Sequence, residues 1–438
     1  MIMEWYWAFL LLMGSFFLLI ALGIPVVFAF FGVNILFLWV FMGDAGLDLM
    51  IDSIYGSLSV FVLLPITLFI LMGEILFRSG IALKMIDTLD RWLGRLPGRL
   101  ALLSVGSGAL LATLSGASIG TTAMLARTLS PAMEARGYSR TMSIGPLLGS
   151  GGLAIMIPPS ALGVVLAVVA SISVGKLLIA IVIPGILLAL SYIVYVVGAC
   201  TLDPSLAPRY EVAPTPIAER LALTAKYVLP LTLIIFLVTG VIFVGIATPT
   251  EAAALGTAGA FVLAACYRGL SWSITRGALY STLRIAVMVL VILAAAQAFT
   301  QLLAYTGSTR YLAQWAADLP IAPIWVVVAM HVVTLILGGP LGGIPLIMMT
   351  VPIFIPVVKA LGYDPVWFSV VMLINVELAQ ITPPFGVLLY VVRGVMPGAS
   401  MAEINRAALP IVLCHLVVMA AIITFPALAM WLPASMAK

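Results

Sequence analysis

Apolar runs recur along nearly the whole chain, and this feature limits the possible folds more than any other. A helix needs about 20 consecutive apolar residues to cross the hydrocarbon core of a bilayer. Hydrophobic residues make up 64% of the 438 residues and charged residues only 8%, against about 25% charged in soluble domains. Only helices and closed barrels satisfy the backbone in lipid, and runs of this length suit helices. The sequence therefore predicts an all-α integral membrane protein.

Ten segments are continuous enough for full spans, and two further apolar stretches are interrupted. The spans are 5–22, 24–42, 57–77, 139–172, 177–199, 226–246, 250–267, 281–306, 365–394 and 407–432. Small residues interrupt the stretches 100–126, at 114–118, and 321–358, at 338–343. Half-helices of about 14 residues reach only about 20 Å, short of a bilayer of about 30 Å. We therefore predict two re-entrant hairpins whose tips are covered by protein or line a water-filled cavity.

The lysines and arginines divide unevenly between the two sets of loops in this arrangement. The larger set holds Arg78, Lys84, Arg91, Arg95, Arg99, Arg127, Arg136, Arg140, Arg209, Arg220, Lys226, Arg268, Arg276, Arg284, Arg393 and Arg406. The smaller set holds Lys176, Arg310, Lys359 and Lys438, together with an acidic loop that contains Asp44, Asp48 and Asp52. The positive-inside rule places the larger set in the cytoplasm and both termini outside. If either hairpin were a full span, this asymmetry would largely collapse.

Residues 131–159 and 356–384 read as two copies of one segment, 225 positions apart, with Pro158-Pro159 over Pro383-Pro384. Each half has five crossings, an odd number, so the second half is inverted relative to the first. The first inverted repeat is 1–200, with its hairpin at about 100–126 and a broken helix at 139–172. A cytoplasmic linker, 201–226, precedes the second repeat, 227–438, with its hairpin at about 321–358 and a broken helix at 365–394. This is the outline of a secondary transporter.

Helices that stop inside a membrane leave carbonyls, which suit Na⁺, and N–H groups, which suit a carboxylate. The first tip and its neighbours offer Thr113, Ser115, Gly116, Ser118, Thr121, Ser150 to Gly152 and Ile157 to Ser160. The second offers Gly338 to Gly343, facing Asn375, Glu377 and Ala379 to Phe385. Glycine and serine also allow close helix packing in membranes. Two matching breaks favour binding over packing alone.

Glu377 is the most informative single residue, because a carboxylate inside an apolar span is costly. It is predicted to be an ion ligand, a proton carrier or a clamp on the second hairpin, and a hydrogen-bonded structural acid is the alternative. Glu74 is expected to pair with Arg78 one turn on. The run 248–251 fits a capping box. The two histidines, at 331 and 415, are expected to pack or to make a polar contact within the bundle, and a proton relay is the less favoured alternative.

Several classes of function lack support in the sequence. The three cysteines are far apart, with no pair spacing for metal or redox use. We find no phosphate-binding loop, zinc cluster, nucleophile triad or nucleic-acid patch. A membrane enzyme is poorly supported, because neither Glu377 nor the lone histidines have an orienting partner. A channel is disfavoured, because two inverted hairpins suggest alternating access. Energy is expected from an ion gradient.

The chain resembles the large membrane subunit of a tripartite ATP-independent periplasmic (TRAP) transporter over essentially its full length. The stretches that carry the resemblance are 114–122, 150–160, 248–254 and 352–386. The resemblance implies an elevator-type importer of organic acids in a bacterial inner membrane, driven by Na⁺. It also implies two partners, a periplasmic substrate-binding protein and a small four-helix membrane subunit. An autonomous, homodimeric symporter or antiporter for carboxylates is the alternative.

Carrying the family's ion sites over gives the expected Na⁺ residues, and the polar residues at the tips and breaks give the expected substrate residues. The Na⁺ set is Thr113, Ser115, Gly116, Ala154 and Ile157 at the first tip, and Gly338, Ala379, Thr382 and Phe385 at the second. The substrate set is Ser118, Thr121, Ser150, Gly342, Asn375 and Glu377. Gly342 stands where the family commonly has an acid, and only Glu377 is nearby to replace it. The substrate is not named by this sequence, because the binding protein largely selects it in that family.

Overall fold

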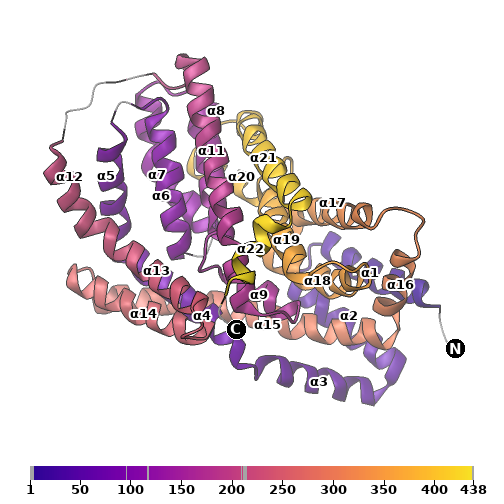
Figure 1. Ribbon diagram of the computed structural model, residues 1–438. Coiled ribbons are helices and arrows are strands. Elements are labelled where there is room, and N and C mark those ends of the chain that lie inside the picture. Colours follow the sequence, from indigo (N-terminus) through magenta and orange to yellow (C-terminus); the bar gives the residue numbers. More distant parts are fainter. Residues whose placement is uncertain (1–3, 95, 116–117, 209, 211–214, 437–438) are drawn as a thin grey trace.

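The computed structural model is helical throughout the residues that it describes, which are 4–94, 96–115, 118–208, 210 and 215–436 (Figure 1). The side chains of 62 and 112–115 also lie outside this description. No strand occurs among the described residues, so the prediction of an all-α membrane protein is confirmed.

The first half of the chain contains helices up to α11. They are α1 (Trp5–Ala21), α2 (Val26–Met42), α3 (Asp44–Leu58), η1 (Phe61–Leu63), α4 (Leu64–Arg78), α5 (Ile81–Leu93), α6 (Arg99–Ser115), α7 (Ser118–Ala135), α8 (Arg140–Met156), α9 (Ala161–Val169), α10 (Val174–Ala180) and α11 (Val182–Leu202). The linker contributes η2 (Pro204–Leu206), α12 (Ile217–Leu223) and the π-helical η3 (Thr224–Val228). The second half has α13 (Leu229–Phe243), α14 (Pro249–Cys266), α15 (Trp272–Tyr305), α16 (Ser308–Ala317), α17 (Pro323–Leu341), α18 (Gly343–Ala360), α19 (Pro365–Ile381), α20 (Val387–Val395), α21 (Met401–Thr424) and α22 (Ala427–Ala434).

Seven helices in the described parts of the chain are long and apolar enough to cross a membrane, or up to nine if each bent pair is one span. Ten spans were predicted. The difference arises partly because α1, α2 and α19 are apolar but only 17 residues long. Helices α17 and α18 change the count in the opposite direction, because each is long enough to span although the sequence assigned both to a hairpin. The count of ten stays a prediction.

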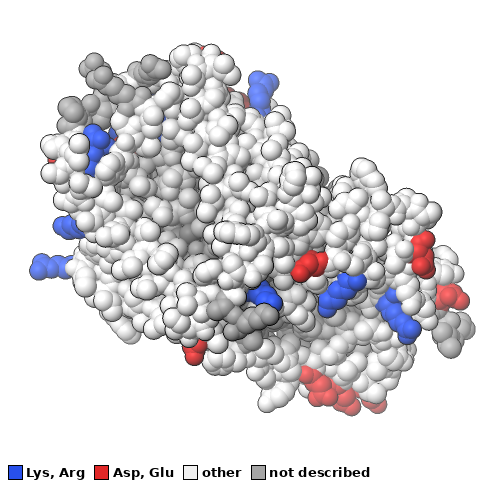
Figure 2. Space-filling view, in the orientation of Figure 1, with Lys and Arg blue, Asp and Glu red and all other residues white. Residues whose placement is uncertain are grey.

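Two local expectations are wrong. The hairpin arms were expected to have about 14 residues, but α6, α7, α17 and α18 have 17, 18, 19 and 18. The first hairpin extends past 126, because hydropathy marks the apolar core of a helix and backbone hydrogen bonds carry it further. The expected acidic loop is helix α3, whose aspartates recur every fourth residue on an exposed stripe. Figure 2 shows these acidic side chains gathered at the lower edge, where Figure 1 places α3.

The repeat appears in the helix boundaries. Helices α7 and α18 begin 225 positions apart (118 and 343), and so do α8 and α19 (140 and 365). Each broken helix has its interruption at the Pro-Pro pair, and both Pro-Pro bonds are cis. The halves also exchange contacts, because α7 packs against α20 and α18 packs against α9. The return arm of each hairpin therefore lies on the broken helix of the other half.

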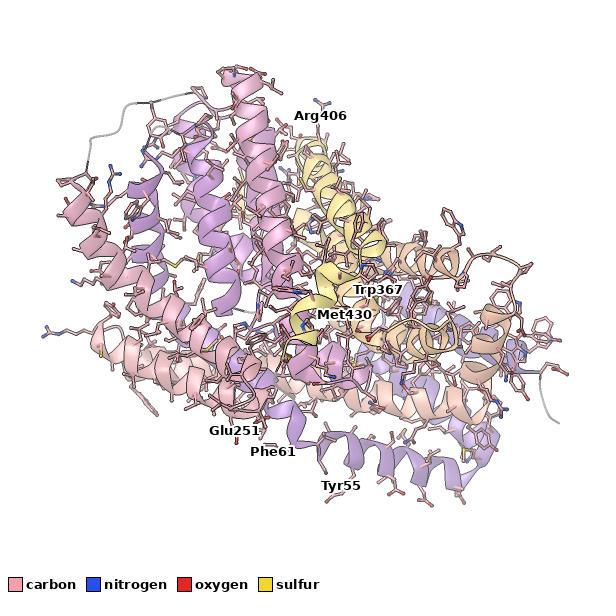
Figure 3. The ribbon with its side chains drawn as sticks, in the orientation of Figure 1. Tyr55, Phe61, Glu251, Trp367, Arg406 and Met430 are labelled. Carbon is pink, nitrogen blue, oxygen red and sulfur yellow. The ribbon has the colours of Figure 1, made fainter. Side chains whose placement is uncertain are left out.

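Polar side chains tie these elements together at a few places. Trp367, labelled in Figure 3, donates from Nε1 to the carbonyl of Ile422 at 3.1 Å and so joins α19 to α21. The linker is joined to α5 by Trp92, which donates to the Thr224 hydroxyl at 2.7 Å. The expected capping box is present at the start of α14. The Thr248 hydroxyl accepts from the backbone N–H of Glu251, and the Glu251 carboxylate accepts from the backbone N–H of Thr248.

Candidate functional site

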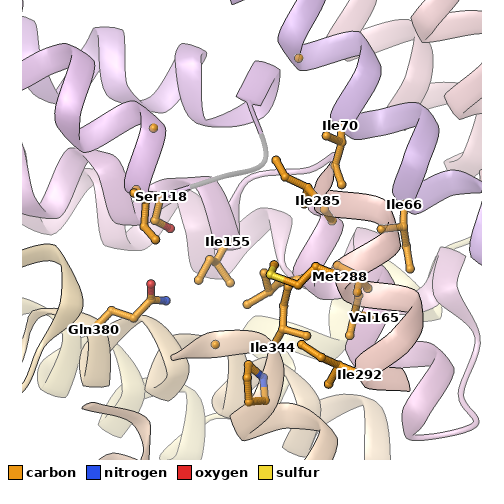
Figure 4. Close-up of a pocket in the computed structure, with 18 of the residues that line it drawn as sticks. Ile66, Ile70, Ser118, Ile155, Val165, Ile285, Met288, Ile292, Ile344 and Gln380 are labelled. Atoms are coloured by element: carbon orange, nitrogen blue, oxygen red, sulfur yellow. The ribbon is translucent and has the colours of Figure 1, made fainter. Parts of the chain in front are cut away.

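A cavity of about 560 Å³ lies between the two hairpin tips on one side and α4 and α15 on the other. Ser118 from α7 and Gln380 from α19 lie on one side of it, across from Ile66, Ile70 and Ile285 (Figure 4). Most of the wall is apolar, with few polar groups, which is the usual composition of a small-molecule site. Both halves contribute, so the cavity lies where the repeats meet.

The two hairpins present helix N-termini to the cavity. The first turn of α7, from Ser118 to Gly120, lines it, and so does the first turn of α18, from Gly343 to Pro345. The first N–H groups of a helix have no partner within the helix and carry the positive end of its dipole. Such ends suit an anion, and two of them suit a carboxylate better than a cation.

Glu74 is the one ionisable side chain among the described residues that line the cavity. Its Oε2 lies 2.7 Å from Nε of Arg78, which confirms the expected pair, and Arg78 also donates to the Ser281 hydroxyl at 2.7 Å. This pair is partly exposed, so it leaves the wall nearly neutral and stabilises the fold only slightly. An anionic ligand would therefore meet little repulsion.

The Na⁺ residues expected at the first tip lie partly beyond what the structure describes. Gly116 lies outside the described residues, and so do the side chains of Thr113 and Ser115 at the end of α6. Ala154 is fully buried in the last turns of α8, and Ile157 caps that helix at its break.

The structure brings together the Na⁺ residues expected at the second tip. A Cβ built on Gly338 would lie 2.5 Å from Cβ of Ala379, so the glycine permits direct contact between α17 and α19. A Cβ on the next residue, Gly339, would lie 2.7 Å from Cβ of Phe385 in the break of α19. The Thr382 hydroxyl donates to the Leu378 carbonyl at 2.6 Å. The end of α17 and the break after α19 thus form one cluster.

The expected substrate residues fall in different surroundings. Ser118 lines the cavity, whereas Ser150, fully buried in α8, donates to the Ser104 hydroxyl on α6 at 3.4 Å. Asn375 on α19 donates from Nδ2 to the carbonyl of His331 on α17 at 2.6 Å. Thr121 is fully buried in α7.

Gly342 joins the arms of the second hairpin at φ 74° and ψ 173°. A Cβ there would meet nothing within 4 Å. Positive φ in this region is essentially restricted to glycine, which explains the residue in physical terms.

Glu377 is fully buried in α19 and does not line the cavity. Its Oε2 accepts a hydrogen bond from the Ser118 hydroxyl at 3.2 Å, so it contacts the tip of the first hairpin. The expected clamp on the second hairpin is instead made by Asn375. Sequence reasoning did not foresee this long-range pair.

Three further features went unnoticed in the sequence or were only partly anticipated. Gln380, in the cavity wall, carried no motif, and only its position one turn after Glu377 could have suggested it. Gly152 leaves the space that the Glu377 carboxylate occupies. The polar contacts expected of the histidines are confirmed, with His331 beside Asn375 and His415 3.2 Å from the Tyr192 hydroxyl.

The sequence matches the family model of the DctM component of tripartite ATP-independent periplasmic transporters over residues 13–428. The chain belongs to this family. The large permease protein of a C4-dicarboxylate TRAP transporter from Pseudomonas aeruginosa is 33% identical over 376 residues, which are 85% of this chain and 86% of that protein. The 2,3-diketo-L-gulonate TRAP large permease of Escherichia coli is 28% identical over 86% of this chain and 87% of its own length.

A third relative and one solved structure extend the comparison. The isethionate TRAP permease DctMQ of Oleidesulfovibrio alaskensis is 29% identical over 96% of this TRAP subunit and 65% of its own length. Among solved structures, the YdaH transporter of Alcanivorax borkumensis aligns with a TM-score of 0.65 at 15% identity over 89% of both chains. At that identity the likeness concerns the fold alone. The described helices are thus arranged as in a known transporter.

Proposed function

We propose that this TRAP subunit imports an organic acid across a bacterial inner membrane together with Na⁺. The observation that carries the proposal is the cavity between the hairpin tips, where the first turns of α7 and α18 meet an apolar wall from α4 and α15. A carboxylate would bind the two helix ends, and the carbon skeleton would contact the isoleucines. Ser118 and Gln380 would fix its orientation.

Na⁺ would bind behind the tips, at backbone carbonyls that the helix breaks release from regular bonding. The cluster of Gly338, Ala379, Thr382 and Phe385 supports one such site, because these residues meet at the end of α17. The repeated break at Ile157 suggests the second. Cations held there would offset the charge of the substrate.

The rest of the mechanism follows the predicted inverted repeats. The hairpins and broken helices would move as one body against α4 and α15, with both chain termini on the periplasmic side. A periplasmic binding protein would deliver the substrate, and a small membrane subunit would brace the static helices. Family membership and the exchange of contacts between α7, α20, α18 and α9 support this arrangement.

Uptake by membrane vesicles that carry the complete system tests the function. The labelled substrates to offer are succinate, isethionate and 2,3-diketo-L-gulonate, the classes named for relatives. We expect uptake of one of them with Na⁺ outside and none when choline replaces Na⁺. Uptake driven by a pH gradient alone, without Na⁺, would remove the Na⁺ assignment.

Purification from the native membrane tests the partners. We expect a small membrane protein of about four spans in a one-to-one complex with this chain. A homodimer that transports without any other protein would instead support the autonomous symporter. Replacing Gly338 with leucine should abolish uptake, and normal uptake by that variant would contradict the site at the second tip.

A further inference from the structure

Among the residues that the structure describes, the buried carboxylate of Glu377 has one hydrogen-bond partner, on one of its two oxygens. Its Oε2 accepts from Ser118 at 3.2 Å, while Oε1 is buried and has no partner among the described residues. The ion pairs in the described part of the chain, those of Arg78, Arg91, Arg99 and Arg140, do not include it. It is also the one buried acidic residue in that part.

Two consecutive glycines of α8 shape the space around this carboxylate. A Cβ on Gly152 would lie 1.9 Å from Oε1 of Glu377, so any other residue would displace the acid. A Cβ on Gly151 would lie 1.8 Å from Oγ1 of Thr122, which is likewise buried and without a described partner. Ser118 and Thr122 lie on one face of α7, four residues apart. Two unpartnered oxygens thus lie against neighbouring residues of α8.

An ionised carboxylate in this position needs a compensating positive charge, because burial without one costs several kcal/mol or more, on the order of the full desolvation penalty. The described titratable and charged side chains on the elements around α19 are Arg127 and Glu134 (α7), Arg140 (α8), Lys176 (α10), Tyr192, Tyr195 and Cys200 (α11), His331 (α17), Lys359 (α18), Tyr390 and Arg393 (α20), and Glu403, Arg406, Cys414 and His415 (α21). The lysines and most of the arginines are exposed, and the buried histidines bond to Asn375 and Tyr192 instead. None of these groups supplies a cation to Glu377.

We propose that Glu377 and Thr122 bind one Na⁺ at a site separate from the carbonyl clusters at the helix breaks. Na⁺ would bind between Oε1 and the Thr122 hydroxyl, since hard cations take oxygen ligands. The site lies one hydrogen bond behind the cavity, because Ser118 both lines the cavity and bonds Glu377. A cation at Glu377 would therefore change the hydrogen-bond partner of Ser118, which is part of the cavity wall, whatever the substrate is.

The experiment compares the full-length chain with Glu377→Gln and, as a matched control, Glu74→Gln. Each purified protein is titrated with radioactive Na⁺ to count bound ions, and its infrared spectrum is recorded for the carbonyl stretch of a protonated carboxylic acid. Loss of one Na⁺ per chain in Glu377→Gln but not in Glu74→Gln supports the proposal. An acid band in wild-type protein with Na⁺ present, absent from Glu377→Gln and retained in Glu74→Gln, would show that Glu377 holds a proton instead and would overturn the proposal.

Equal Na⁺ counts in all three proteins would also overturn the proposal. If Glu377→Gln does not fold, Thr122→Val keeps the carboxylate and removes the second oxygen. We then expect the affinity of one bound Na⁺ to fall about tenfold or more, or about 1.4 kcal/mol. Unchanged Na⁺ binding in Thr122→Val contradicts the inference.

Discussion

Replacing Gly152 with alanine should force the Glu377 side chain out of its present position. The new Cβ would lie 1.9 Å from Oε1, 2.5 Å from Cδ and 2.8 Å from Cγ of that residue, all shorter than any relaxed contact. Overfilling a packed interior costs about 1–3 kcal/mol, and alanine in a helix recovers about 0.5–1 kcal/mol of backbone entropy. We therefore expect the free energy of unfolding to fall, by up to about 2.5 kcal/mol.

Gly198→Ala is the matched control for this substitution. Gly198 also lies within a helix, α11, and a Cβ there would meet nothing within 4 Å, so alanine should raise the stability by about 0.5–1 kcal/mol. Both variants are measured by equilibrium unfolding in mixed micelles with sodium dodecyl sulfate. In a Glu377→Ala background the clash disappears, so Gly152→Ala should then behave like the control. Equal stability of Gly152→Ala and Gly198→Ala, or the same cost with and without Glu377, would refute the close contact.

Three further predictions concern the hairpin, a helix cap and the tie between α17 and α19. Gly342→Ala should lower the free energy of unfolding by about 1–3 kcal/mol because of its φ of 74°, although space is open around it, whereas Gly394→Ala, also in open space, should not. Thr248→Ala should cost about 1 kcal/mol by removing the capping box at the start of α14, and the same unfolding assay checks it. Asn375→Ala should cost about 1–3 kcal/mol, because the His331 carbonyl loses a buried donor at 2.6 Å; stability equal to wild type would contradict this role.

The positions of the helix breaks could be predicted because proline acts locally. Each Pro-Pro pair removes backbone donors at a known position, so the interruptions after Met156 and Ile381 follow from the residues themselves. The ends of the hairpin arms could not be predicted in the same way. Hydropathy marks where a helix is apolar, whereas α7 continues to Ala135 on backbone hydrogen bonds. The sequence also predicts a loop where helix α3 forms. Its aspartates suggest a loop, but they lie on the exposed face of a helix.

The sequence predicts which polar residues belong to the candidate site, but not which of them contact one another. The polar residues near the tips, such as Ser118 and Asn375, stand out in an apolar sequence. Their partners do not, because the contact between residues 118 and 377 depends on how two halves of the chain pack. The sequence predicts that Glu377 faces the tip of the second hairpin. The packing of the two halves instead places its carboxylate against Ser118 of the first hairpin.

The exchange of contacts between the halves joins the hairpins to the broken helices, because α7 packs on α20 and α18 packs on α9. The two hairpins and the two broken helices thus form one packed unit, which contains the buried pair of Ser118 and Glu377. The cavity is bounded by this unit on one side and by α4 and α15 on the other. A ligand in the cavity would contact both parts, so we expect it to affect their relative position. A cation at Glu377 would contact the unit alone. We therefore expect substrate binding and cation binding at Glu377 to be coupled through Ser118, and Ser118→Ala to weaken that coupling while both sites persist.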